Sequence, residues 1–249
     1  MFYSQFGEDR ILFNVFKDKK HGICVEVGAN DGVNDSTSYF FEKLGWNCIL
    51  VEPNPDLCRQ IRSVRSATLY EYAASNSSRV TALYIAEGAE RSHGVSTISD
   101  DKEVHNRIKN YGFSCRPVVV QTKTLDEMLQ DVQINAAIDF ISIDVEGHEL
   151  EVLEGFSIEK WKPTVILVED NSNYESPIVS NYLSKYGYVR FRRTGVNDWY
   201  SSRKNRQLVN LKNRSSYWLS ALYTKSINRL RKNPIFLKFK KLIKQICGR

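Results

Sequence analysis

Acidic residues follow the buried strands that the sequence predicts. They are Glu26, Glu52, Asp144, Glu146 and Glu169, and Asp170 comes directly after the last of them. The carboxyl ends of parallel strands share one edge of a sheet, so these carboxylates are expected to gather around one crevice. Charged groups in a crevice cost desolvation free energy unless they bind something, so the pattern indicates a functional site.

Two chemical roles are open for these carboxylates. Asp144 and Glu169, with Asp170 beside them, could hold a divalent cation such as Mg²⁺ through oxygen ligands. Such a cation would lower the pKa of a substrate hydroxyl and orient it. Alternatively one carboxylate, or His148 one helical turn beyond Asp144, takes the proton directly as a general base, with Glu146 in support. The residues alone do not decide between a metal and a direct base.

A βαβ unit at residues 23–53 is the element around which these residues are organised. Residues 23–29 form an apolar strand, a turn with Gly28 and Gly32 follows, and a helix carries Tyr39 and Phe40 on its apolar face. A second strand at residues 48–51 then ends at Glu52. The unit therefore places a glycine turn after one strand and an acid at the tip of the next.

This arrangement is specific about the type of ligand. Glycine lets the backbone approach a ligand closely, and Glu52 is placed to accept hydrogen bonds from two ribose hydroxyls. The turn reads G-x-N-x-G and lacks the glycine pattern that clears a helix N-terminus for a pyrophosphate. We therefore predict S-adenosylmethionine (SAM), which has a ribose and an amino-acid moiety. A dinucleotide and a unit without any ligand are the alternatives.

Three other segments bear on this site. Residues 67–74 form a third predicted strand, and its end at Ser75 would flank the adenine. Near the N-terminus, Gln5 precedes a short amphipathic helix and either touches the cofactor or only packs on the sheet. The polar insertion at residues 87–115 is either a substrate loop or lid, or a mobile irregular segment, and its histidines are expected to be solvated.

The charge of the chain is divided unevenly along its 249 residues. From Trp199 onward there are 14 Lys and Arg and no Asp or Glu, whereas the preceding part has 21 basic and 29 acidic residues.

Five cysteines without a C-x-x-C pair favour a reducing compartment, and no stretch approaches ~18 consecutive apolar residues. We expect a soluble, cytoplasmic body at residues 1–200 and a basic tail at residues 201–249.

The tail is predicted to hold a basic amphipathic helix at about residues 233–247. Ile235, Phe236 and Phe239 share its apolar arc with later residues, and lysines occupy most of the rest. This composition favours peripheral binding to an anionic membrane surface, which in a cytoplasmic protein means the inner face of the membrane. Docking on the acidic body, a homodimer and, least favoured, a nucleic acid are the alternatives.

Six segments resemble the FkbM family of SAM-dependent methyltransferases. They are S-Q-F-G-E-D at 4–9, V-E-V-G-A-N-D-G at 25–32, V-E-P-N-P at 51–55, T-L-D at 124–126, I-D-V-E-G-H-E-L-E-V-L-E-G-F at 143–156 and V-E at 168–169. The segments follow the order of the family and cover residues 3–200. The insertion and the tail have no counterpart in that pattern.

The resemblance implies an α/β fold of the class I, Rossmann-like type, a mostly parallel doubly wound sheet. It implies O-methylation of a hydroxyl on a sugar, a glycan or a related natural product. It places Glu26, Gly28, Asn30, Gly32 and Glu52 around SAM, and Asp144 and Glu146 at the reaction edge. The alternatives are a nucleic-acid methyltransferase that grips phosphate with the tail, and an inactive membrane-associated scaffold of the same fold.

Overall fold

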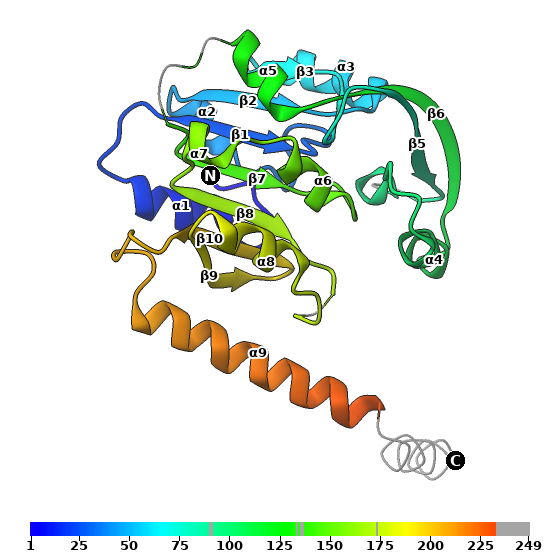
Figure 1. The fold of residues 1–249 in the computed structure, drawn as a ribbon. Coiled ribbons are helices and arrows are strands. Elements are labelled where there is room, and N and C mark those ends of the chain that lie inside the picture. Colours follow the sequence, from blue (N-terminus) through cyan, green and yellow to red (C-terminus); the bar gives the residue numbers. More distant parts are fainter. Residues whose placement is uncertain (90–91, 133, 135–136, 173, 233–249) are drawn as a thin grey trace.

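A computed structural model describes residues 1–232 except 90–91, 133, 135–136 and 173. Its main sheet has seven strands in the order β3-β2-β1-β7-β8-β10-β9 (Figure 1). The strands are β1 (Ile23–Val27), β2 (Asn47–Val51), β3 (Thr68–Tyr70), β7 (Phe140–Ile143), β8 (Val165–Glu169), β9 (Tyr188–Thr194) and β10 (Asn197–Ser202). Strands β3, β2, β1, β7 and β8 run parallel, and β10 runs antiparallel to both β8 and β9. The prediction of a mostly parallel α/β sheet is confirmed.

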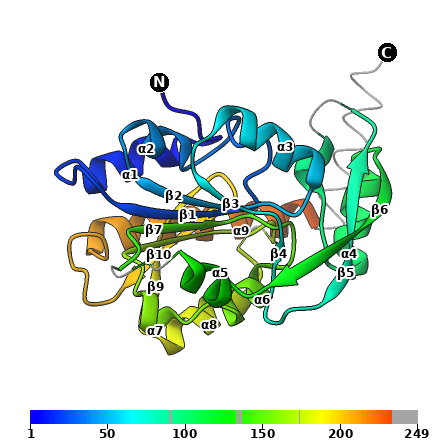
Figure 2. The ribbon, with the colours of Figure 1, turned by 90° about the horizontal axis from the view of Figure 1, so that it is seen from above.

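Helices cover both faces of this sheet, as the view from above shows (Figure 2). On one face lie α1 (Glu8–Phe16), α2 (Tyr39–Lys43) and α3 (Pro55–Val64); on the other lie α5 (Leu125–Asp131), α6 (Glu149–Glu154), α7 (Ile158–Trp161) and α8 (Ile178–Lys185). Alternate residues of β1 divide between the two layers: Cys24 packs with Leu12 and Phe41, whereas Val25 packs with Leu129. Burial on both faces explains why these strands read as nearly continuous apolar runs.

The strand order reverses between β1 and β7, and this reversal creates the site. After β1 the chain passes outward to β2 and β3, and later it returns to β7 on the other side of β1. The loops that leave β1 and β7 therefore diverge at the carboxyl edge and open a crevice between them. Gly28 follows β1 and Asp144 follows β7, so both residues lie at this switch point.

A second, three-stranded sheet projects from the carboxyl edge with the order β4-β6-β5. It consists of β4 (Ala73–Ala74), β5 (Val80–Glu87) and β6 (Ser114–Lys123), and its connection carries η1 (Ser92–Val95) and α4 (Lys102–Asn110). The predicted third strand at 67–74 is therefore divided between two sheets. The insertion at residues 87–115 is built of ordered elements where it is described, which favours the lid alternative over the irregular one.

Between β10 and residue 232 the chain forms the long helix α9 (Leu211–Lys232), which packs against β9 (Figure 1). The predicted amphipathic helix at 233–247 lies outside the described residues. The boundary expected at residue 200 falls within β10, which ends at Ser202. Among the described helices, none has both the length and the apolar composition that crossing a membrane requires.

Candidate functional site

A cavity opens at the switch point, between the ends of β1, β2 and β7 and the η1 segment. Its walls include Gly28, Asn30, Glu52, Asp144 and His93, together with apolar side chains from β1, β2, α3 and the second sheet. The cavity is thus apolar on its flanks and polar at a few points, which is the usual character of a small-molecule site. We call it the donor cavity.

Glu52 is held rigidly in the donor cavity by the backbone around it. One carboxylate oxygen accepts the Asn30 N–H at 2.9 Å, and the other accepts the Asn54 N–H at 2.9 Å. Glu52 is 6% exposed, and burial raises the pKa of its side chain to about 7 despite those two hydrogen bonds. Each carboxylate oxygen has a further lone pair, so Glu52 can still accept from a bound diol.

Gly28 is required by the packing of two strand ends rather than by a ligand alone. Its φ is +82°, and a Cβ built there would lie 1.8 Å from the backbone oxygen of Asp144. Gly32 likewise has φ +81° and lies against Ile61 of α3 and Arg65, the residue that follows α3, outside the donor cavity. The glycine turn therefore brings β1 and β7 together, while Gly28 also forms part of the cavity wall.

Replacing Gly28 with Ala should destabilise the protein by about 2–3 kcal/mol, because positive φ and a backbone clash add together. Gly45→Ala is the matched control: Gly45 has φ +82°, but a Cβ added there would meet nothing within 4 Å, so only about 1 kcal/mol is expected. Urea denaturation of both variants measures the difference. Equal losses would mean that the Asp144 contact does not matter.

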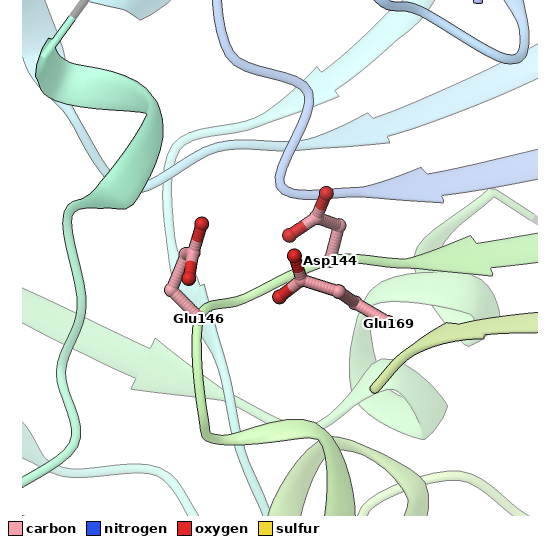
Figure 3. Close-up of side chains that lie close together, drawn as sticks. All are labelled: Asp144, Glu146 and Glu169. Atoms are coloured by element: carbon pink, nitrogen blue, oxygen red, sulfur yellow. The ribbon is translucent and has the colours of Figure 1, made fainter. Parts of the chain in front are cut away.

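Three carboxylates meet beside the donor cavity, at the ends of β7 and β8 (Figure 3). Asp144, Glu146 and Glu169 each offer an oxygen, and these oxygens lie within 4.8 Å of one another. The Asp144 and Glu169 carboxyls are close enough for each to influence the ionisation of the other. We refer to these three residues as the carboxylate cluster.

Burial raises the pKa of every member of the cluster, and the charge of Asp144 adds to the rise at Glu146 and Glu169. The pKa of Asp144 rises to about 6 and that of Glu146 to about 8, and that of Glu169 rises well above its usual value. Asp144 remains accessible because it faces the cavities, yet protein atoms surround it and desolvate its charge. At neutral pH the cluster therefore holds protons and can exchange one with a bound group.

Glu146 is fixed by partners from both sides of the crevice. Arg107 of α4 forms an ion pair with it, and the Asn171 side-chain amide lies 3.4 Å from the same oxygen. The backbone of Glu146 has φ +55°, an unfavourable conformation for a residue with a Cβ. Strain of this kind persists where the surrounding structure holds a side chain in a functional position.

A second cavity lies on the other side of the cluster, and we call it the acceptor cavity. Ile98 lines both cavities, Asp144 and Glu146 line the donor cavity, and Glu169 and Arg107 line the acceptor cavity. In the lining of the acceptor cavity, carboxylates outnumber guanidinium groups. They are Asp100, Asp101, Glu103, Glu149, Glu151, Glu169, Asp170 and Asp198, against Arg79, Arg107 and Arg190. The cluster thus separates two spaces of different character.

A comparison with models of protein families shows which family the chain belongs to. The model of the Methyltransferase FkbM domain matches residues 26–190, more than half of the sequence. The chain belongs to the FkbM methyltransferase family. It is accordingly a SAM-dependent methyltransferase, and the resemblance drawn from its sequence segments is confirmed.

Solved structures of other methyltransferases are similar to this FkbM protein. Precorrin-6y C5,15-methyltransferase from Geobacter metallireducens GS-15 shares 13% identity, with 77% of this chain and 84% of that chain covered and a TM-score of 0.40. TrmK of M. capricolum, in complex with S-adenosyl-homocysteine, shares 10% identity over 96% and 95% of the two chains, with a TM-score of 0.40. No curated protein matches this chain in the corresponding sequence comparison.

The donor cavity of this FkbM protein fits SAM. Two buried polar atoms on its walls, Asn30 Oδ1 and His93 Nε2, have no hydrogen-bond partner among the described residues. Such atoms cost free energy unless a ligand or water satisfies them. Together with Glu52, they supply polar contacts for a nucleoside within a mostly apolar cavity.

A smaller adjoining cavity extends from Gly28, Asn30 and Asp144 towards the N-terminus. Gln5 is exposed at its edge and lines it, as does Glu26. The Glu26 carboxylate is already used by the loop before α2: it accepts Ser36 Oγ at 2.7 Å, the Thr37 N–H at 2.6 Å and Ser38 Oγ at 2.5 Å. Its negative charge still faces this cavity, where the cationic end of SAM would benefit from it.

The structure places Asp170 apart from the carboxylate cluster, which corrects the predicted metal set. Its carboxylate accepts from Arg193 Nη1 at 2.9 Å and from the Ser172 N–H at 2.9 Å. Burial alone would raise the pKa of Asp170, but these hydrogen bonds and the charge of Arg193 lower it. The third carboxylate of the cluster is Glu146, which the sequence placed only in a supporting role.

His148 and Ser75 also lie differently from the prediction. Ser75 Oγ and His148 Nε2 are 3.0 Å apart, Ser75 is fully buried, and Ser75 does not line the donor cavity. The other ring nitrogen of His148 faces Glu151 at 3.6 Å, so neither nitrogen is paired with Asp144. Burial lowers the pKa of His148, which lines the acceptor cavity as a neutral group at pH 7.

Two residues of the site were missed by sequence reasoning, and both belong to the insertion. His93 lines the donor cavity instead of standing in solvent, and Arg107 neutralises part of the cluster. Neither residue stands at a distance in the sequence from other polar residues that would indicate a binding or catalytic role. Only the folding of η1 and α4 back over the carboxyl edge brings them to the site.

Proposed function

We propose that this protein transfers a methyl group to a hydroxyl of a sugar, a glycan or a related natural product. One observation carries the proposal: the carboxylate cluster lies between a cavity that fits SAM and a second, highly polar cavity. A hydroxyl becomes a good nucleophile only when it loses its proton, and the cluster is placed between the two substrates to accept that proton.

The lining of the acceptor cavity supports a polyhydroxyl acceptor. Carboxylates, arginines, serines and Asn171 alternate around it, and such groups can accept from or donate to many hydroxyls. The excess of carboxylates disfavours an acceptor rich in phosphate, because like charges would face each other. This cavity therefore gives no support to the nucleic-acid alternative.

The residues of the chain have distinct tasks in this reaction. SAM supplies a methyl group that is already activated by its positive sulfur. Glu52, Asn30 and His93 would hold the nucleoside, and the positioning of donor and acceptor accounts for much of the rate. Asp144, with a pKa of about 6, accepts the proton of the acceptor hydroxyl as the new oxygen–carbon bond forms, and Glu169 shares it.

A divalent cation such as Mg²⁺ is the second route that we propose to test. Asp144, Glu146 and Glu169 provide the oxygen ligands that such a cation prefers. Bound there, it would lower the pKa of the acceptor hydroxyl. Competition with Arg107 for Glu146 would accompany binding, so added Mg²⁺ and EDTA should give different activities if this route operates.

The test is an acceptor screen that follows S-adenosylhomocysteine formation. Neutral sugars and glycans are compared with RNA, each with Mg²⁺ and with EDTA, and NMR locates the new methyl group. We expect a methyl ether on a carbohydrate or related hydroxyl. Methylation of a nucleobase would contradict the proposal, and SAM binding without turnover on any acceptor would favour the scaffold alternative.

Location is a further part of the proposal. We propose that the protein is cytoplasmic and that its basic tail binds the inner face of the membrane peripherally. The competing proposal is that the tail forms a homodimer. Support comes from the 14 basic residues and the absence of acids after Asp198.

A further inference from the structure

The α9 helix has one face docked on the catalytic domain. Tyr217 is 6% exposed and Ala221 is 4% exposed. The guanidinium of Arg190, on β9, lies 4.9 Å from the centre of the Tyr217 ring. The Tyr174 ring also packs against the Tyr217 ring. These contacts fix the rotation of α9 about its own axis.

The opposite side of α9 carries large apolar side chains that no described element covers. They are Leu211 (86% exposed), Trp218 (56%), Leu219 (68%), Leu222 (60%) and Tyr223 (69%). Their spacing of 7, 8, 11 and 12 residues from the first places them on one side of a helix. We call this set the outer face of α9. Figure 1 shows that α9 lies beyond β9, at the margin of the molecule.

We propose that the outer face of α9 binds an anionic lipid surface. Leucines together with Trp and Tyr are the residues that enter the boundary between headgroups and acyl chains. Exposed Lys212, Arg214 and Lys225 lie on the same helix, and no acidic residue occurs anywhere after Asp198. These charges complement anionic headgroups.

A second copy of the chain fits this face less well. Pairing two outer faces would bring two strongly basic segments together, because each copy carries 14 Lys and Arg and no acid from Trp199 onward. Like charges across an interface cost free energy, whereas an anionic bilayer attracts both. The charge of the segment therefore selects lipid over self-association.

Trp218 provides a direct measurement. The chain has four Trp residues, and Trp46, Trp161 and Trp199 are at most 5% exposed. Trp218 is the exposed one, so its emission should shift to the blue when vesicles of phosphatidylcholine and phosphatidylglycerol are added to the full chain. Vesicles of phosphatidylcholine alone should give a much smaller shift, and Trp218→Phe should remove the signal while sedimentation with vesicles persists.

Leu219→Glu is the decisive variant. It puts a negative charge in the middle of the outer face, and the affinity for the anionic vesicles should fall about tenfold or more. Val119→Glu is the matched control, because Val119 is 76% exposed on β6 and its replacement also adds one carboxylate. The control should sediment with vesicles as the wild type does. SAM binding and the melting temperature show that both variants are folded, and Leu219→Ser replaces Leu219→Glu if the latter is not.

Two results would overturn the proposal. One is unchanged vesicle affinity in both Leu219 variants, with no shift of Trp218 emission. The other is a dimer in light scattering without lipid that Leu219→Glu converts to a monomer, since the outer face would then be an interface between copies. Neither result depends on methyl transfer, so the inference stands or falls separately from the proposed reaction.

Discussion

Glu52→Ala is expected to weaken SAM binding by about 10²–10³-fold, because a charged acceptor for two ribose hydroxyls is lost. Glu52 is buried at the end of β2, and its two backbone contacts hold it towards the donor cavity. Isothermal titration calorimetry with SAM measures the effect without any acceptor. Unchanged affinity would mean that SAM does not place its ribose beside Glu52.

Two controls separate this loss from a general loss of structure. Glu159→Ala removes an exposed carboxylate on α7 and should leave SAM affinity as it is in the wild type. The melting temperature of Glu52→Ala shows how much the lost hydrogen bonds to Asn30 and Asn54 cost on their own. A variant that is folded and binds SAM weakly isolates the contribution of the carboxylate.

The raised pKa of Glu52 adds a pH dependence with a defined sign. Burial raises its pKa to about 7 in the SAM-free protein, so the side chain is mostly protonated at low pH. The ribose hydroxyls prefer the ionised carboxylate, so SAM affinity should increase as pH rises through about 7. Glu52→Gln cannot ionise and should bind SAM with little dependence on pH in that range.

Asp144→Asn is expected to lower the rate of methyl transfer by about 10²–10⁴-fold, because an amide cannot accept the hydroxyl proton. The folded chain should tolerate the change, since Asn has nearly the same shape and Asp144 is accessible from the cavities. The measurement is kcat at saturating SAM with the acceptor found in the screen. A loss confined to KM would contradict a role in proton transfer.

The pH profile distinguishes this role from a structural one. In the wild type, activity should rise as pH passes about 6, the pKa to which burial raises Asp144. Asp144→Asn should lose this acid limb, while Glu159→Gln, a surface control, should keep it. Because the Asp144 and Glu169 carboxyls are close enough to influence each other's ionisation, the limb belongs to the pair and should shift in Glu169→Gln.

The sequence by itself determined the central part of this protein. Apolar strand runs, the glycine turn and Glu52 are local features, and their spacing specifies a βαβ unit because strand and helix periods are read directly from the chain. The resemblance to the FkbM family then implied the class I, doubly wound type of α/β fold. The gathering of Asp144, Glu146 and Glu169 could also be predicted, since the carboxyl ends of parallel strands lie at one edge of the sheet.

The tertiary structure alone decided which of several similar residues meet in the carboxylate cluster and in the donor cavity. Asp170 is adjacent to Glu169 and also lines the acceptor cavity, but Arg193 binds its carboxylate and it stays outside the carboxylate cluster. His148 turns to Ser75, and His93 and Arg107 reach the site from an insertion that is distant in sequence from the strand ends that they approach. Side-chain direction and long-range docking depend on packing between elements distant in sequence, and no local pattern of residues encodes that packing.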